Sequence, residues 1–161
     1  MPLIRLLASG GLASEIAKAG QDPLEKAIEN DRADIVELLL NAGGDPNAVA
    51  SGGEPPVELA LSLDHGEDIM RLLLRAGANL KTHSWRYAHS PLDWAITKGY
   101  GTGMLKEMIA HGADWREEDR GSGLLYEAVR VHNRQAAQLL IDLGADTVQL
   151  DEDDLRELNR R

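Results

Sequence analysis

One pattern of residues returns four times along this 161-residue chain. In each copy, a short apolar segment with a central alanine precedes a leucine-rich segment that ends at a glycine. The pattern has a period of about 33 residues, as shown by the alanines Ala27, Ala60, Ala95 and Ala128 and the glycines Gly43, Gly77, Gly112 and Gly144. Such a period predicts a stack of repeated units, because no single unit can bury its own apolar side.

Each copy predicts two short helices joined by a turn. In the first copy Asp22 is placed to cap a helix that begins at Pro23, and Ser90 precedes Pro91 in the same way. Such side chains accept hydrogen bonds from the first free backbone amides of the helix. A proline at the first helical position loses no hydrogen bond, because the amide there has no partner within the helix. Pro55 offers no acceptor, so we expect a helix start weaker by about 1 kcal/mol in the second copy. The second helices are expected to be capped by Asp34, Asp68 and Thr102.

The end of each copy predicts a turn and a buried face. A glycine directly after the last helical turn adopts a positive φ without strain, so the four closing glycines are expected there. The residues expected to form the buried faces of the second helices are Leu38, Leu39, Leu72, Leu73, Met108, Ile109, Leu140 and Ile141. One extra residue around 64–67 and another around 99–103 are expected to bulge the turn between paired helices without breaking the stack.

The openings and closings of the copies carry a resemblance to a known family. The opening is of the type Pro-Leu-x-x-Ala, and Ser90-Pro91-Leu92-Asp93 stands nearest to the family's Thr-Pro-Leu-His, which no copy keeps intact. The closing turn recurs as Gly77-Ala78-Asn79, Gly112-Ala113-Asp114 and Gly144-Ala145-Asp146. From Asp22 to Asp146 the chain therefore resembles the ankyrin repeat. The resemblance implies an all-α solenoid of helix-turn-helix units with β-hairpin finger loops and helical caps.

The resemblance also divides the chain, which its length makes a single domain. The expected segments are an N-terminal helical cap at 1–21, repeats at 22–54, 55–89, 90–122 and 123–146, and a C-terminal capping helix at 147–161. The acidic run Asp151–Asp154 suits the positive end of that last helix dipole. The fingers are expected within 45–54, 79–89 and 114–122.

Two interpretations of the N-terminal segment remain open. In the first, Leu3–Ser9 and Leu12–Ala19 form a short helical hairpin that caps the first repeat. In the second, only Leu3–Ser9 is structured as half of a repeat, because Gly10 precedes Gly43 by one period of the pattern.

The net charge of −10 is concentrated in the first part of the chain. From Glu15 to Asp68 there are 13 acidic and 3 basic residues, whereas Ile69 to Leu143 holds 8 acidic and 10 basic residues. A nucleic-acid partner is disfavoured, because phosphate binding needs a basic surface. We expect instead a basic protein partner, with the alternative that these acids only keep the chain soluble.

Composition and the N-terminal sequence bear on the cellular setting. The chain has no cysteine, which fits a reducing, cytoplasmic compartment. The uncharged run Leu6–Ser14 is interrupted by Gly10-Gly11, so neither a signal peptide nor a membrane span is expected. An aromatic content of 4% without phenylalanine favours a bacterial protein. The acidic C-terminal cap favours a monomer.

No segment predicts a catalytic or metal site. His83 and His89 share one expected finger, but no cysteine or carboxylate completes a zinc site there. The run Asp151–Asp154 lacks the glycine and the alternating spacing of a calcium loop. We expect no enzyme and no cofactor, and a weak hydrolase that uses His83 and His89 is the remaining catalytic alternative. The residues expected to be structural are His65, His111, His132, Trp94, Tyr100 and Tyr126.

The resemblance implies a binding surface made of finger tips and the exposed sides of the first helices. On the helices its members are Glu29, Asn30, Ser62, Leu63, Thr97, Lys98 and Arg130. On the fingers they are Trp85, Arg86, Tyr87 and His89, and then Trp115, Arg116, Glu117, Glu118 and Asp119. Aromatic residues and arginine commonly anchor interfaces. The alternative is that Trp85 and Trp115 pack as structural plugs against adjacent fingers.

These features predict non-catalytic recognition of another protein. The sharper hypothesis is a bacterial immunity protein that neutralises a cognate toxin. The alternative is an adaptor or regulatory subunit of an endogenous enzyme or complex.

Overall fold

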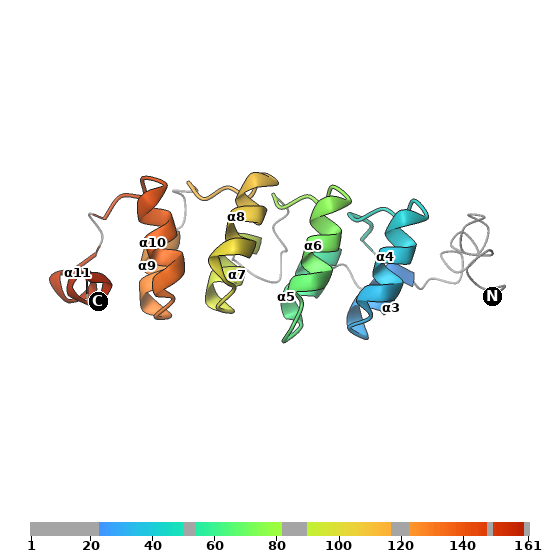
Figure 1. The fold of residues 1–161 in the computed structure, drawn as a ribbon, viewed down its shortest axis with the longest axis horizontal. Helices are drawn as coiled ribbons and strands as arrows, with labels where there is room; N and C mark the ends of the chain where they lie inside the picture. The colour runs from blue at the N-terminus through green and yellow to red at the C-terminus, as the bar shows by residue number, and fades with distance from the viewer. Residues whose placement is uncertain (1–22, 50–53, 82–89, 117–122, 148–149, 160–161) are drawn as a thin grey trace.

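Pairs of antiparallel helices stand side by side in a single row (Figure 1). The computed structural model describes residues 23–49, 54–81, 90–116, 123–147 and 150–159. Its helices are α3 (Pro23–Glu29), α4 (Ala33–Asn41), α5 (Pro56–Ser62), α6 (Glu67–Arg75), α7 (Pro91–Thr97), α8 (Thr102–Ala110), α9 (Leu124–Arg130), α10 (Arg134–Asp142) and α11 (Glu152–Asn159). We call the pairs α3/α4, α5/α6, α7/α8 and α9/α10 units 1 to 4.

The expected all-helical class is confirmed for the described residues, which contain no β-strand. Each expected finger lies partly outside the described residues, at 50–53, 82–89 and 117–122. The β-hairpin form of the fingers therefore stays a prediction. No described helix is long and apolar enough to cross a membrane.

All four units use helices of the same two lengths. The first helix of each has 7 residues and the second has 9. The extra residues of units 2 and 3 are absorbed in the connections, 63–66 and 98–101, which are one residue longer than 30–32 and 131–133. The prediction of a bulged turn in an unbroken stack is therefore confirmed. Asp31, Gly99 and His132 turn these connections with φ values of 53°, 79° and 56°.

The core lies between neighbouring units. First helices contact first helices along α3, α5, α7 and α9, and second helices contact second helices along α4, α6, α8 and α10. The small central residues allow the first helices to approach closely, since Ala60, Ala95 and Ala128 are fully buried and Ala27 is 5% exposed. Besides these alanines, the core contains the buried side chains of Ile28, Leu61, Ile96, Met70, Leu73, Leu105, Met108 and Leu140.

One predicted core residue is wrong, and three are only partly buried. Leu38 is 41% exposed, because α4 belongs to the first described unit and its outer flank has no described unit beside it. The half-buried residues are Leu72, Ile109 and Ile141. The predicted core positions that are buried are Leu39, Leu73, Met108 and Leu140.

The closing glycines end the second helices as predicted. Their φ values are 89°, 89°, 97° and 93° at Gly43, Gly77, Gly112 and Gly144. In each unit the amide after the glycine donates back to a carbonyl in the last turn, as Ala113 does to Met108 at 3.0 Å, while Gly112 donates to Ile109 at 3.0 Å. This pair of hydrogen bonds is a Schellman motif, which satisfies carbonyls that the helix end leaves open.

The predicted cap of α7 is correct, and the predicted caps of α4, α6 and α8 are wrong. The hydroxyl of Ser90 accepts from the amide of Asp93 at 3.2 Å, as expected for α7. Asp22 lies outside the described residues. The residues Asp34, Asp68 and Thr102 lie inside their helices, so the cap positions belong to Arg32, Gly66 and Gly101, none of which makes a side-chain cap bond. Pro55 makes none either, as predicted.

Asn133 supplies a cap that the sequence analysis missed. Its Oδ1 accepts from the amide of Ala136 at 3.1 Å at the start of α10. Its Nδ2 donates to the carbonyl of Ile96 at 3.0 Å, at the end of α7 in the preceding unit. One side chain therefore both begins a helix and ties units 3 and 4 together.

The side chain of Asn47 joins units 1 and 2. Asn47 accepts from the amide of Asn79 at 2.7 Å and donates to the carbonyl of Gly77 at 3.3 Å.

Asp151 accepts from the amides of Asp153 and Asp154 at the start of α11, and Asp154 accepts in return from the amide of Asp151. This reciprocal arrangement is a capping box built from aspartates. The acidic run therefore begins a helix, as its charge pattern predicted.

We expect Gly112→Ala to lower the free energy of unfolding by about 1–2 kcal/mol, because alanine is strained at a positive φ even where no atom obstructs its Cβ. Gly103→Ala is the matched control, since Gly103 lies in α8 without a positive φ and with open space around its Cβ. It should raise stability by up to about 1 kcal/mol through helix propensity. Urea unfolding followed by circular dichroism measures both, and equal stabilities would contradict the conformational argument.

We expect Asn133→Ala to cost about 1–2 kcal/mol, because it removes both the cap and the bond to Ile96. Asn133→Asp keeps the cap acceptor but loses the donor, and should cost less than the alanine. Ser90→Ala removes a cap alone and should cost about 1 kcal/mol. Thermal and urea unfolding compare the three variants, and an Asn133→Ala variant as stable as the wild type would contradict a stabilising role for either contact.

Candidate protein-binding face

The first helices turn one side away from the core, and we call this side the first-helix face. In a helix of 7 residues, positions spaced by three and four share a side, so Leu24, Ala27 and Ile28 face inward together on α3. The residue two places after each central alanine points outward. These residues, Glu29, Ser62, Thr97 and Arg130, are all exposed.

The charge of the first-helix face changes along the row. The outward residue is the acid Glu29 in unit 1, a neutral residue in units 2 and 3, and the base Arg130 in unit 4. The position two places before the central alanine is occupied by Glu25, Glu58, Asp93 and Tyr126 in succession. Glu25 and Asp93 are half-buried, and Glu58 is buried at 4% exposed. Acids therefore occupy this position in units 1 to 3 but not in unit 4.

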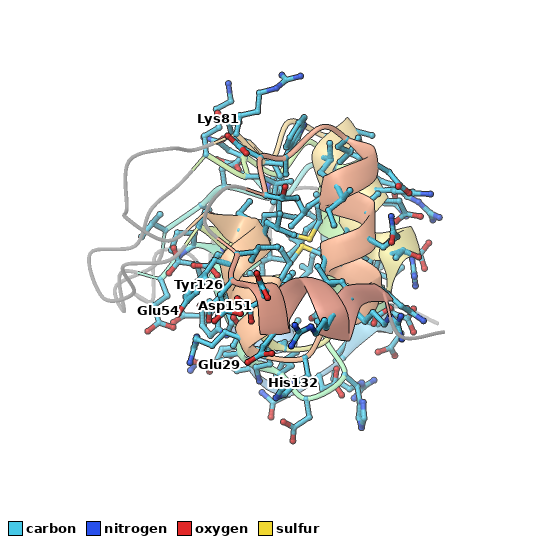
Figure 2. All side chains as sticks on the ribbon, turned by 90° about the vertical axis from the view of Figure 1, so that its left-hand side faces the viewer. Glu29, Glu54, Lys81, Tyr126, His132 and Asp151 are labelled. Carbon is cyan, nitrogen blue, oxygen red and sulfur yellow. The ribbon has the colours of Figure 1, made fainter. Side chains whose placement is uncertain are left out.

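Figure 2 looks along the row from the C-terminal end. Glu29, Glu54 and Tyr126 lie on the same side of the row, and Lys81 lies at its opposite edge. Tyr126, which the sequence analysis expects to be structural, is 40% exposed. An exposed phenol on the same side as carboxylates is an amphipathic group that suits a protein interface.

Two bases on the first helices, Arg130 and Lys26, are held by neighbouring acids. Arg130 Nε donates to Glu127 Oε2 at 2.9 Å, and the second guanidinium contact reaches Glu127 Oε1. The carboxylate of Glu127 is buried at 8% exposed and raises the pKa of Arg130. Lys26 Nζ donates to Glu29 Oε2 at 2.6 Å in the same way, which raises the pKa of Lys26. Exposed pairs of this kind contribute little stability.

The remaining predicted residues on the first helices lie at the ends of the helices. Asn30 is exposed and donates from Nδ2 to the carbonyl of Lys26 at 2.7 Å. Leu63 is half-buried, while Lys98 is exposed and its Nζ donates to the carbonyl of Ser62 at 3.4 Å across units 2 and 3. All the predicted helix residues except Leu63 are therefore exposed.

Residues 114–116 are the described part of the expected finger at 114–122. Trp115 is half-buried against the core, and its predicted packing against adjacent fingers stays a prediction. The guanidinium of Arg116 lies over the ring of Trp115 at 4.5 Å from its centroid, and the backbone amide of Arg116 donates to Asp114 Oδ1 at 2.9 Å. The predicted finger residues outside the described part are Trp85, Arg86, Tyr87, His89, Glu117, Glu118 and Asp119.

No group of three or more histidines and acids that could hold a metal ion occurs among the described residues. His65, His111 and His132 are exposed and stand apart in the turns or helix ends of different units. His83 and His89 lie outside the described residues. Trp94 packs partly buried against the core, as its position predicted.

Comparison with known families agrees with the repeated geometry. Residues 19–51 match the family model described as the ankyrin repeat. The chain carries an ankyrin repeat. The match covers unit 1, and units 2 to 4 repeat the helix lengths of this ankyrin unit and its closing positive-φ glycine. No curated protein matches the chain significantly.

Ankyrin repeats generally mediate protein–protein interactions. The described residues provide a row of similarly oriented first helices whose outward side is exposed. That arrangement offers a rigid surface for a partner without placing reactive groups together.

Tyr100 is a buried titratable group in the connection between α7 and α8. Its side chain is 5% exposed, and its Oη has no hydrogen-bond partner among the described residues. Burial, helped by the negative charge of Glu67, raises the pKa of Tyr100 to about 12. The Oη lies beside unit 2, since a Cβ on Gly66 would come within 3.2 Å of it.

We expect the free energy of unfolding to fall between pH 10 and pH 12 more steeply in the wild type than in Tyr100→Phe. Below the unfolded pKa of 10.0 both states keep the phenolic proton. Above it the unfolded chain loses the proton while the folded state retains it, so unfolding becomes more favourable as pH rises. Urea unfolding across this range measures the slope.

Tyr126→Phe is the matched control, because it removes the hydroxyl of a tyrosine that is 40% exposed and not buried. At neutral pH Tyr100→Phe should be at least as stable as the wild type, since it removes a buried hydroxyl without a described partner. Parallel profiles for Tyr100→Phe and the wild type would contradict the pKa assignment.

Proposed function

We propose that the chain is a non-catalytic recognition protein that captures a basic partner protein through the first-helix face and the fingers. The observation that carries the proposal is the distribution of charge on that face. Glu25 and Glu29 lie on unit 1, whereas the outward base Arg130 lies on unit 4 and is paired with Glu127. A partner with basic residues would meet unit 1.

The physical basis is electrostatic steering followed by short-range contact. Complementary charge accelerates encounter and fixes orientation, while buried anchors govern how long the complex lasts. Acids near the start of the row would therefore raise the association rate and make it sensitive to salt. Tyr126, the stacked Trp115–Arg116 pair and the aromatic residues of the finger at 79–89 would supply the anchors.

The sharper form of the proposal is a cytoplasmic immunity protein of a bacterium that binds a cognate toxin and blocks its active site. The support is the net charge of −10 together with a compact chain that joins interaction repeats to no predicted reactive site. Many nucleic-acid-cleaving toxins would need a basic surface for phosphate, which an acidic face complements. A monomeric chain would present the whole face to one toxin molecule.

The test is a pull-down with the tagged chain at low and high salt, followed by identification of the retained proteins. We expect a basic partner that Glu25→Lys/Glu29→Lys no longer retains at low salt. Glu37→Lys is the matched control, because it reverses the same charge in the same unit but on the second helix, α4, where the side chain is exposed.

The association and dissociation rate constants are then measured with the purified partner. Reversal of Glu25 and Glu29 should lower the association rate constant by about tenfold or more at low salt, and Trp85→Ala should raise the dissociation rate. A partner that is toxic when expressed alone and harmless with this chain would support the immunity form. A housekeeping enzyme held through the same face would favour an adaptor, and an unchanged association rate would remove the electrostatic proposal.

A further inference from the structure

Short asparagine side chains join unit 1 to unit 2 and unit 3 to unit 4. Asn47 accepts from the amide of Asn79 at 2.7 Å and donates to the carbonyl of Gly77 at 3.3 Å. Asn133 donates to the carbonyl of Ile96 at 3.0 Å. We call each of these contacts an asparagine tie, because a side chain of one unit binds the backbone of its neighbour.

The position of Asn47 is occupied in unit 2 by Lys81, since each lies four places after its closing glycine. The amide of Asn47 donates to Asp45 Oδ1 at 2.9 Å. The amide of Lys81 donates to Asn79 Oδ1 at 2.9 Å, so the two backbones match. An ammonium group has donors but no acceptor. Lys81 therefore cannot accept from the amide of Asp114 in the way that Asn47 accepts.

The position of Asn133 is occupied in unit 3 by Tyr100. Each lies five places after a central alanine and donates its amide to that alanine, Tyr100 to Ala95 at 3.0 Å and Asn133 to Ala128 at 2.8 Å. The side chain of Tyr100 also reaches the preceding unit, because a Cβ on Gly66 would come within 3.2 Å of its Oη. The same backbone position thus sends a side chain across the interface in both units.

Tyr100 makes no tie with the hydroxyl that it carries to unit 2. Its side chain is 5% exposed, and its Oη has no hydrogen-bond partner among the described residues. A buried hydroxyl without a partner costs free energy, because its contact with water is lost and not replaced. The position that strengthens the interface between units 3 and 4 therefore weakens the interface between units 2 and 3.

Two polar contacts that cross between units 2 and 3 come from the ends of long side chains. Lys98 Nζ donates to the carbonyl of Ser62 at 3.4 Å, and Arg71 Nε contacts Glu107 Oε2 at 3.4 Å. The side chains of Arg71 and Glu107 are 34% and 49% exposed. Exposed ion pairs contribute little, because water screens them and long side chains lose rotamer freedom. These contacts are weak substitutes for an asparagine tie.

We propose that the interface between units 2 and 3 is a joint at which the row separates into two cooperative halves, units 1–2 and units 3–4. Each half is held together by its own asparagine tie. The proposal is independent of the proposed function. It places Glu29 and Arg130, the two charged ends of the first-helix face, in different halves.

Two spectroscopic probes test the joint in the full chain. Trp85→Phe leaves Trp94 on α7 and Trp115 after the closing turn of unit 3, so tryptophan fluorescence reports on the second half. Far-ultraviolet circular dichroism reports on the helices of all units. In urea we expect two transitions in circular dichroism, with midpoints separated by about 0.5 M or more. Fluorescence should follow only one of them.

The amplitude of each step identifies where the row divides. All four units have helices of the same two lengths, so each step should carry about half of the helical signal. A first step with about a quarter of the signal would assign the division to a single terminal unit and overturn the proposal. Coincident single transitions in both probes would show that the row unfolds as one body and would also overturn it.

Matched variants in the Trp85→Phe background test the cause. Lys81→Asn supplies an acceptor for the amide of Asp114 and a donor for the carbonyl of Gly112, so it should at least halve the separation of the midpoints. Lys81→Ala removes the same lysine without adding a tie and should leave the separation undiminished. Equal effects of the two substitutions would contradict the joint.

Tyr100→Phe gives an independent readout of the same interface. It keeps the ring and removes the hydroxyl that has no described partner, so it should also bring the two midpoints together. Tyr126→Phe is its control, because Tyr126 is 40% exposed on α9. An unchanged separation in Tyr100→Phe would show that the buried hydroxyl does not weaken this interface.

Discussion

The contact of each unit with its neighbour is the interaction on which the rest of this structure depends. The helices are too short to be stable alone in water, so they persist because stacking buries their apolar sides. The central alanines set the spacing, since a larger side chain at the fully buried Ala60, Ala95 or Ala128 would force the first helices apart. Because all units stack alike, their first helices share one orientation, and the first-helix face follows from the core.

Much of the fold could be predicted because it obeys rules that act within a few residues. The positive φ of each closing glycine, the cap at Ser90 and the two lengthened connections were all visible in the spacing of residues. The caps of the second helices could not be placed, because a shift of one or two residues in a helix start changes which side chain is the cap. Asn133 carried a signal, an asparagine directly before a helix-forming run, that was overlooked.

Exposure was harder to predict than secondary structure, because it depends on what lies next to a side chain. Leu38 looks like a core leucine within its own helix, and Tyr126 looks like a turn residue. The exposed positions of the first helices were predicted well, since the resemblance assigns them by register. The pairing of Arg130 with a buried Glu127 was not predicted, because both depend on how the helix packs in the row.

A row of units that touch only their neighbours need not open all at once. Unit 1 has a single described neighbour, α5/α6, whereas units 2 and 3 are held on both sides. Local unfolding in such an array begins where the fewest interfaces must be broken. The acidic end of the first-helix face thus coincides with the first unit of the described row. A ligand held there would also slow fraying of the array and couple occupancy to protection of backbone amides against exchange.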